Sequence, residues 1–203
     1  LLVNRKNVFL TLYLFILSVF STSCKNENKM NLAINTIPQP QSVITGKSSL
    51  DLKTINKIII KTESKQELAV AQFFQNLLKP INHIGIGRFS NHHKNHLFIS
   101  LNKDSNLPNE GYRLEIKEQS ISLEASTFGG LFYGFQTFRQ LCDSKLESGS
   151  LPKNTIVPEC TIEDFPEFKY RGMHLDVSRH FFDIKFIKTY IDMIALHKMN
   201  VFH

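Results

Sequence analysis

The sequence lacks the short motifs of several common enzyme classes. Its nearest match to a phosphate-binding loop is Gly46-Lys47-Ser48, but Gln41 stands where that motif needs its first glycine. No two histidines flank a glutamate as in zinc peptidases, and no serine lies between glycines as in the nucleophile elbow of esterases. Gly85-Ile86-Gly87 lacks the third glycine of a dinucleotide site, and Gly129-Gly130 lacks a preceding strand of the nucleotide-binding type and an acidic partner. We therefore expect these glycines to serve turns or close packing.

Charge of one sign is not concentrated along the chain. There are 24 lysines and arginines against 18 aspartates and glutamates, which gives a formal net charge of +6. The basic residues are scattered rather than gathered into a stripe, which argues against nucleic acid as the main partner. This distribution is typical of a solvated surface of mixed charge.

Candidates for metal or redox chemistry are few. Cys142 and Cys160 can form a disulfide in an oxidising compartment or remain unpaired buried thiols, because sequence alone fixes no distance between them. His92, His93 and His96 have a spacing that a metal could exploit with a nearby carboxylate, but their polar surroundings favour a solvated loop. We predict no metal site and no cofactor.

The N-terminus has the pattern of an export signal. Arg5 and Lys6 precede an uncharged apolar run over residues 8–20. That run of 13 residues is shorter than the ~20 residues that a helix needs to span a bilayer. We therefore predict a signal peptide over residues 1–23.

The residues around Cys24 predict a lipid anchor. Small residues at positions 21–23 lead into Cys24, an arrangement that resembles the lipobox of bacterial lipoproteins, with Ser21 in place of the usual leucine. The resemblance implies that Cys24 is lipidated and that the protein is held in the bacterial envelope, at the periplasmic face or the cell surface. Soluble secretion and an uncleaved anchor are the alternatives. Residues 24–36 are polar and read as a tether.

Residues 37–164 alternate short strands with two helices. Strands are predicted at 58–60 and 97–101, and a hairpin at Tyr112, Leu114 and Ile116 with Ile121, Leu123 and Ala125, around a turn at Glu118-Gln119. Ser64 and Glu67 form a possible capping box for a helix that Pro80 ends, and a second helix runs from near Thr127 to Leu141. This order predicts an α+β domain, an antiparallel sheet with helices on one face. We place its boundary near Asp164, Phe165 and Pro166.

Residues 165–203 read as one β-α-β unit. A strand is predicted over Tyr170–Val177, and Val201 and Phe202 begin a second strand. Between them Asp183 caps a helix, whose apolar residues recur at helical spacing as Ile184, Ile187, Ile191, Ile194 and Met199. A single unit of this kind cannot bury its own faces, so we expect the chain to be the truncated N-terminal part of a longer protein.

Four stretches carry a resemblance to a known family: YRGMHLDVSRHFF and HKMNVFH in the C-terminal part, and IPQPQSV and GGLFYGFQTFRQL before it. The first two closely resemble the opening of the catalytic domain of glycoside hydrolase family 20, the exo-acting β-N-acetylhexosaminidases, and the other two resemble its preceding non-catalytic domain. The resemblance implies that residues 165–203 are the start of a (β/α)8 TIM barrel, a fold that typically needs about 250 residues. It also implies hydrolysis of terminal β-linked GlcNAc or GalNAc from glycoconjugates.

The family mechanism implies a catalytic pair that the chain does not contain. In substrate-assisted retaining catalysis, the 2-acetamido oxygen of the substrate attacks the anomeric carbon, while an adjacent Asp-Glu pair orients the amide and protonates the leaving oxygen. No aspartate is followed by glutamate in this sequence. We therefore expect the dyad to lie beyond the C-terminus and the 203-residue chain to be inactive alone. The alternative is a non-catalytic, carbohydrate-binding envelope lipoprotein with a degenerate barrel.

Arg171 is the strongest candidate for contact with the substrate. The resemblance implies that the arginine of the YRG motif grips the 3- and 4-hydroxyls of the terminal sugar, and its planar fork of donors suits vicinal hydroxyls. A structural ion pair is the alternative. Strand alternation places Arg171 opposite His174 and Asp176, so the two sets line one pocket only if Gly172 breaks the alternation.

Two other polar residues near the strand ends are weaker candidates. Asp176 and His203 are candidates for the wall of the sugar pocket. Asp176 with Arg179 or His180 is more readily interpreted as a buried polar network that steadies the end of the strand.

Overall fold

The computed structural model describes residues 34–62, 64–88 and 94–203. The predicted signal peptide, Cys24, most of the tether, and both His92 and His93 lie outside the described residues. The chain comprises an N-terminal domain (residues 37–164) and a C-terminal segment (residues 165–203). No helix in the described ranges combines the length and apolar character needed to cross a membrane.

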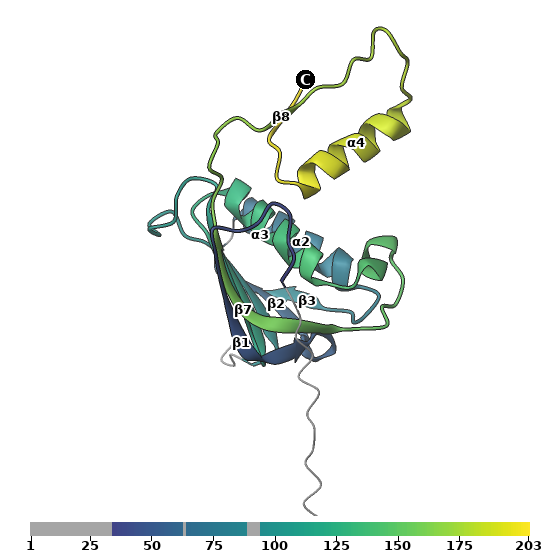
Figure 1. Cartoon of the computed structure of the whole chain (residues 1–203). Helices are drawn as coiled ribbons and strands as arrows, with labels where there is room; N and C mark the ends of the chain where they lie inside the picture. Colours follow the sequence, from purple (N-terminus) through teal and green to yellow (C-terminus); the bar gives the residue numbers. More distant parts are fainter. Residues whose placement is uncertain (1–33, 63, 89–93) are drawn as a thin grey trace, which may run out of the picture. The chain divides into compact units, whose positions relative to one another are not determined.

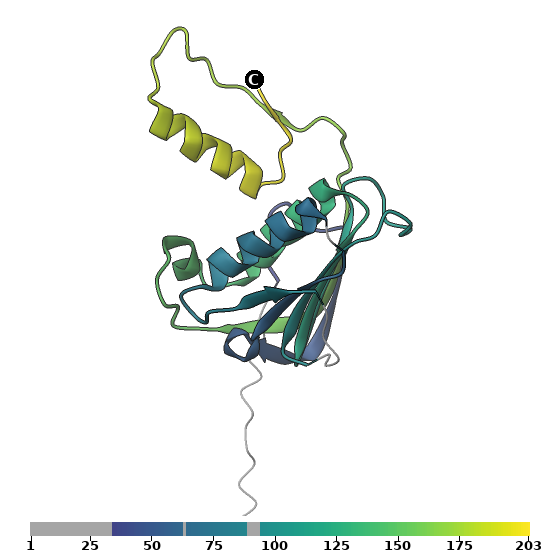
Figure 2. The same ribbon diagram turned by 180° about the vertical axis from the view of Figure 1, so that it is seen from behind.

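The N-terminal domain is a seven-stranded sheet with two helices on one face (Figures 1 and 2). The strands are β1 (Ser42–Asp51), β2 (Lys57–Ile60), β3 (Gly85–Gly87), β4 (His96–Leu101), β5 (Tyr112–Lys117), β6 (Ser120–Ala125) and β7 (Ile156–Asp164). They lie in the order β1-β7-β5-β6-β4-β2-β3. The helices are α2 (Lys65–Leu78) and α3 (Phe128–Leu141), and 3-10 turns occur at Leu52–Thr54 and Ser144–Ser148.

The sheet is mixed, whereas the sequence predicted an antiparallel one. β5 and β6 form the predicted antiparallel hairpin, in which Tyr112 pairs with Ala125 and Lys117 with Ser120. However, β2 runs parallel to both β3 and β4, and β4 runs parallel to β6. Helix α2 connects β2 to β3, and a helical crossover returns the chain so that the next strand runs parallel. Alternation of apolar residues indicates which face of a strand is covered but not the direction of its neighbour.

An aromatic cluster joins α2 to α3 in the core. The ring centroid of Phe74 on α2 lies 5.0 Å from those of Phe135 and Phe138 on α3. Phe74 and Phe138 are fully buried, as are Leu114 and Ile116 on the inner face of β5. Each such side chain stabilises the fold by roughly 1.5–3 kcal/mol on burial. The apolar spacing that predicted the two helices therefore also marks the faces on which they meet.

The predicted capping box of α2 is half correct. Ser64 is the N-cap, and its side chain accepts a hydrogen bond from the Gln66 amide. Glu67 does not return to the N-cap amide but is fully buried. It accepts from the Thr62 amide at 2.7 Å and from the Leu101 amide at 2.6 Å. A buried carboxylate needs several hydrogen-bond donors. Glu67 takes one of them from the Leu101 amide at the end of β4 instead of from the Ser64 amide.

Glycine lets α3 approach the start of β5. The Thr127 side chain caps α3 by accepting from the Gly130 amide at 3.2 Å. A Cβ at Gly130 would lie only 2.2 Å from the carbonyl oxygen of Gly111, a backbone atom that cannot easily move. The close-packing role predicted for the glycine pair is therefore confirmed at Gly130.

The two described cysteines are unpaired thiols, which decides between the alternatives left open by the sequence. Burial raises the pKa of the Cys160 thiol to about 11, and Glu159 adds to the shift. Burial also raises the pKa of Cys142, with Glu147 and Asp143 contributing. Thiols with raised pKa values stay protonated and react slowly at neutral pH.

The C-terminal segment is the predicted β-α-β unit. β8 (Gly172–Met173) and β9 (Val201–Phe202) are parallel, and helix α4 (Ile184–Leu196) connects them. Asp183 caps α4 by accepting from the Phe186 amide at 2.7 Å, as predicted. β8 is shorter than the predicted strand because its ladder with β9 covers two residue pairs. No residue of α4 is buried, and Ile184 is 72% exposed, so its apolar face is uncovered in the described chain.

Candidate functional site

Polar side chains gather beyond the carboxyl ends of β8 and β9. A hollow at this point is lined by His174, Leu175, Asp176, Val177, Ser178, Arg179 and His203. The Nδ1 atoms of His174 and His203 lie 2.9 Å apart, so the two histidines join the neighbouring strands. In barrels built from β-α-β units, chemistry is placed at the carboxyl ends of the strands. This hollow is therefore the candidate site.

Asp176 and Arg179 form an ion pair in this hollow. Asp176 also accepts hydrogen bonds from the Ser178 amide at 2.9 Å and the Arg179 amide at 3.2 Å. The hydrogen bond from the Arg179 side chain, followed by these amide bonds, holds the pKa of Asp176 below its ordinary value. Asp176 is thus a carboxylate that orients Arg179. The predicted polar contact between Asp176 and Arg179 is therefore confirmed, but the Arg179 side chain is 88% exposed, so the prediction that this network is buried is wrong in the described chain.

Arg171 lies at the opposite end of β8 and faces the N-terminal domain. Its guanidinium donates to Glu110 Oε2 at 3.1 Å and to Tyr133 Oη at 3.0 Å. It also donates to the carbonyl oxygens of Phe168 at 2.7 Å and Lys198 at 2.8 Å. The side chain is only 14% exposed. Four of its five N–H groups are thus engaged, and this geometry favours the structural ion pair over the predicted sugar contact.

Strand alternation separates the predicted residues as the sequence indicated. Arg171 lines a cavity with Glu110 and Tyr133, whereas His174 and Asp176 line the hollow at the carboxyl ends. Gly172 therefore does not bring the two sets into one pocket. The structure brings Asp176 and His203 together with Arg179, and it leaves Arg171 outside that group.

Lys198 is an important residue that the sequence reasoning missed. It precedes β9, and its side chain is only 8% exposed. The Lys198 amine donates to Asp164 Oδ2 at 2.6 Å and to Tyr112 Oη at 2.9 Å. Burial lowers the pKa of Lys198, and the charge of Asp164 opposes that shift. The sequence feature that could have indicated a buried cation is Asp164, a carboxylate at an inward position of β7.

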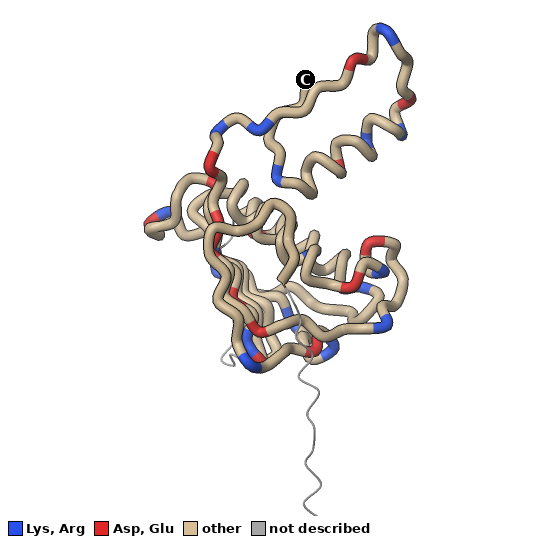
Figure 3. The backbone as a smooth tube through the Cα atoms, in the orientation of Figure 1, with Lys and Arg blue, Asp and Glu red and all other residues tan. Residues whose placement is uncertain are grey.

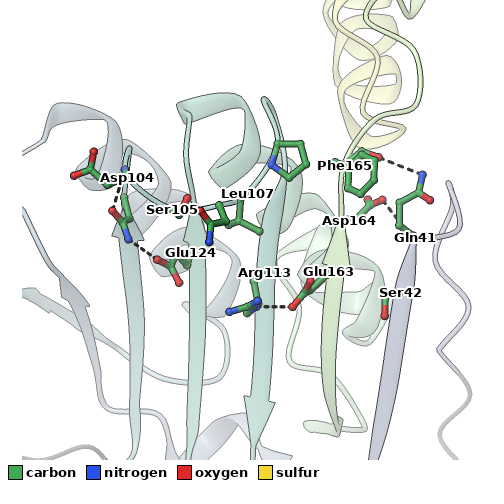
Figure 4. Close-up of a pocket in the computed structure, with 13 residues that line it drawn as sticks. Gln41, Ser42, Asp104, Ser105, Leu107, Arg113, Glu124, Glu163, Asp164 and Phe165 are labelled. Carbon is green, nitrogen blue, oxygen red and sulfur yellow. Dashed lines mark hydrogen bonds and ion pairs between the residues drawn. The ribbon is translucent and has the colours of Figure 1, made fainter.

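A second, polar hollow of ≈ 510 Å³ is lined by residues of β5, β6 and β7, the start of β1 and the loop that follows β4 (Figure 4). Several of its charged side chains have partners within the protein. Arg113 pairs with Glu163 at 2.6 Å, and Glu124 accepts from Asn102 at 2.9 Å. Within residues 34–62, 64–88 and 94–203, no three histidine, cysteine, aspartate or glutamate side chains could hold a metal ion. Acidic and basic residues are interspersed along the described chain (Figure 3), so we assign no site here.

Family models match nearly all of the described chain. The model of glycosyl hydrolase family 20, domain 2, matches residues 33–165, and the model of the family 20 catalytic domain matches residues 168–203. The two matched stretches coincide with an α+β fold and with the β8-α4-β9 unit.

Curated relatives of the chain are named as hexosaminidases. The chain is 33% identical over 175 residues to a beta-hexosaminidase of Porphyromonas gingivalis, which covers 84% of this chain and 22% of that relative. It is 35% identical over 105 residues to a beta-N-acetylhexosaminidase of Cellulomonas fimi, covering 52% of this chain and 20% of that relative. The chain thus spans about a fifth of the length of these relatives.

Solved structures show the same fold. The GH20 beta-N-acetylhexosaminidase of Streptomyces coelicolor A3(2) matches with a TM-score of 0.74 and 32% identity, over 83% of this chain and 34% of that one. A beta-N-acetylhexosaminidase of Bacteroides fragilis matches with a TM-score of 0.68 and 28% identity, over 84% of this chain and 33% of that one. These matches confirm the predicted fold class, an α+β domain followed by the start of a (β/α)8 barrel. The chain belongs to glycosyl hydrolase family 20.

Proposed function

We propose that the protein carrying this chain is an exo-β-N-acetylhexosaminidase. It hydrolyses terminal β-linked GlcNAc or GalNAc from glycoconjugates by substrate-assisted retaining catalysis. The observation that carries the proposal is the match of the family 20 catalytic domain to the β8-α4-β9 unit, whose carboxyl ends hold the polar cluster. A Streptomyces plicatus beta-hexosaminidase of similar fold has been solved in complex with its product GlcNAc, which supports an N-acetylhexosamine as the ligand.

Arg179 is the residue of this chain that we assign to sugar binding, in place of Arg171. Its fork of N–H donors can hold two vicinal hydroxyls of the terminal sugar side by side. Asp176 fixes the orientation of that fork through its ion pair and its two amide hydrogen bonds. The joined imidazoles of His174 and His203 form the neighbouring wall. The bond-breaking chemistry itself is assigned to an Asp-Glu dyad outside this sequence.

A chromogenic assay tests the proposal. The protein with its complete barrel is expected to release nitrophenol from p-nitrophenyl N-acetyl-β-glucosaminide, and the 203-residue chain alone is expected to release none. The matched control substrate is p-nitrophenyl β-glucoside, which lacks the acetamido nucleophile and should not be turned over. Turnover by the 203-residue chain, or equal turnover of both substrates, contradicts the mechanism. Sugar binding without turnover by the whole protein favours a carbohydrate-binding lipoprotein instead.

We also propose that the protein is exported and anchored in a bacterial envelope through a lipid on Cys24. The support is the short apolar run followed by small residues and Cys24. Replacing Cys24 with serine is expected to move the protein from the detergent phase to the aqueous phase in Triton X-114 partitioning. Cys160→Ser is the matched control, because it removes a buried thiol and should leave the partitioning unchanged. Aqueous partitioning of the unaltered protein would favour soluble secretion.

A further inference from the structure

Two cations of the C-terminal segment enter matched sockets on the N-terminal domain. Each socket pairs a carboxylate with a tyrosine hydroxyl. Lys198 donates to Asp164 and Tyr112, and Arg171 donates to Glu110 and Tyr133. Both cations also lie over the ring of the tyrosine in their socket, at 5.0 Å for Lys198 and 5.3 Å for Arg171. Residues 32–203 form one compact unit, in which these sockets are internal contacts.

The Lys198 socket is the more deeply buried of the two. Tyr112 is 1% exposed, and its hydroxyl lies 2.5 Å from Thr137 Oγ1 and 3.0 Å from Asp164 Oδ2. The other oxygen of Asp164 accepts from the Gln41 amide at 3.3 Å. Each polar atom of the socket therefore has a partner, and removing either charge leaves the other buried and uncompensated.

The sockets also hold the amino ends of β8 and β9 together. Arg171 immediately precedes β8, and its amide donates to Asn200 Oδ1 at 3.0 Å, next to the start of β9. The Asn200 amide in turn donates to the Arg171 carbonyl oxygen at 3.0 Å. The pairing of β8 with β9 at Gly172–Val201 and Met173–Phe202 continues in the hydrogen bond from the Leu175 amide to the His203 carbonyl oxygen. Paired backbone therefore connects the amino ends of the two strands to the residues of the candidate site.

We propose that Lys198 and Arg171 are positioning residues through which the N-terminal domain sets the arrangement of the candidate site. With the amino ends of β8 and β9 fixed in the two sockets, their carboxyl ends hold Asp176, Arg179 and the His174–His203 pair in one geometry. The N-terminal domain thus acts on substrate binding without touching the sugar. This inference rests on the proposed function for its activity readout but not for its structural readout.

The test compares two neighbouring substitutions on β7 in the protein with its complete barrel. Asp164→Asn removes the charge that Lys198 meets, whereas Glu163→Gln removes the exposed partner of Arg113. We expect Asp164→Asn to lower kcat/KM roughly 10–100-fold at a temperature well below unfolding, because small misplacements of binding groups have effects of that size. Glu163→Gln should leave kcat/KM within about twofold, as expected for an exposed ion pair. Asp164→Glu keeps the carboxylate and should restore most of the loss.

Amide hydrogen exchange gives a readout that does not depend on activity. The Leu175 amide donates to the His203 carbonyl oxygen at 2.8 Å, and the His203 amide donates to the Met173 carbonyl oxygen at 2.9 Å. In Asp164→Asn these two amides should exchange about tenfold faster or more than in Glu163→Gln, because β8 and β9 separate more often. If the protein shows no hexosaminidase activity, the proposed function fails and hydrogen exchange still decides this inference.

A double variant keeps the inference testable if the single variant does not fold. Asp164→Asn with Lys198→Met removes both buried charges and leaves neither uncompensated. If Asp164→Asn does not fold, the double variant is compared with Glu163→Gln in the same two measurements. Lower kcat/KM or faster exchange at Leu175 and His203 supports the inference. A lowered melting temperature with kcat/KM and exchange equal to those of Glu163→Gln overturns it, because the sockets would then only stabilise the fold.

Discussion

Replacing Arg179 with alanine in the protein with its complete barrel is expected to lower kcat/KM for a terminal β-N-acetylglucosaminide by roughly 10²–10⁴-fold. A hydrogen bond to a charged group contributes about 1.5–3 kcal/mol, and the Arg179 fork offers two of them to vicinal hydroxyls. Each 1.36 kcal/mol corresponds to about a tenfold change. Steady-state kinetics with the chromogenic substrate, with kcat and KM measured separately, provides the measurement.

Two further variants sharpen this prediction. Arg179→Lys keeps the positive charge but loses the planar fork, so most of the loss should remain. Arg113→Ala is the matched control, because Arg113 is also an exposed arginine in an ion pair but lies on β5, in the N-terminal domain. It should change kcat/KM by less than about twofold. An Arg179→Ala variant that behaves like this control would remove Arg179 from the sugar site.

Phe74→Ala is expected to lower the free energy of unfolding of the N-terminal domain by about 3–5 kcal/mol. Phe74 is fully buried, and its ring contacts those of both Phe135 and Phe138 across the interface of α2 and α3. Alanine would lose the buried apolar surface and leave a cavity between two helices that the sheet holds in place. Urea denaturation followed by circular dichroism measures the change.

The control for this substitution is Phe128→Ala at the start of α3. Phe128 is 38% exposed, so its removal should cost less than about 1 kcal/mol. Comparable losses in the two variants would mean that the aromatic cluster is not the centre of the core.

The elements of the fold that could be predicted are those whose apolar residues repeat with a clear period. Helices α2 and α3 and the β5–β6 hairpin each bury that apolar face, whereas α4 carries one that is uncovered in the described chain. β1 was missed because it is an exposed edge strand whose register shifts between Thr45 and Ser49. β7 was missed because Pro158 and the inward Asp164 interrupt an otherwise apolar pattern.

Two of the predicted site residues, Asp176 and His203, line the hollow at the carboxyl ends of the strands, and Arg171 does not. Motif resemblance favoured Arg171, whereas our assignment of Arg179 to sugar binding rests on the position of each arginine relative to β8. Arg171 precedes the strand and Arg179 follows its carboxyl end, where barrel enzymes place their chemistry. Arg171 contacts Glu110 and Tyr133, which are both more than 35 residues away in sequence, so only the folded chain shows these contacts.

The buried sockets have a consequence for the order of folding. Because a polypeptide emerges N-terminus first, the sheet and its two helices can be complete before residue 198 leaves the ribosome. Lys198 then meets Asp164 and Tyr112 in a surface that is already formed. The N-terminal domain would thus provide a folded surface on which β8 and β9, the first two strands of the barrel, are positioned as they form.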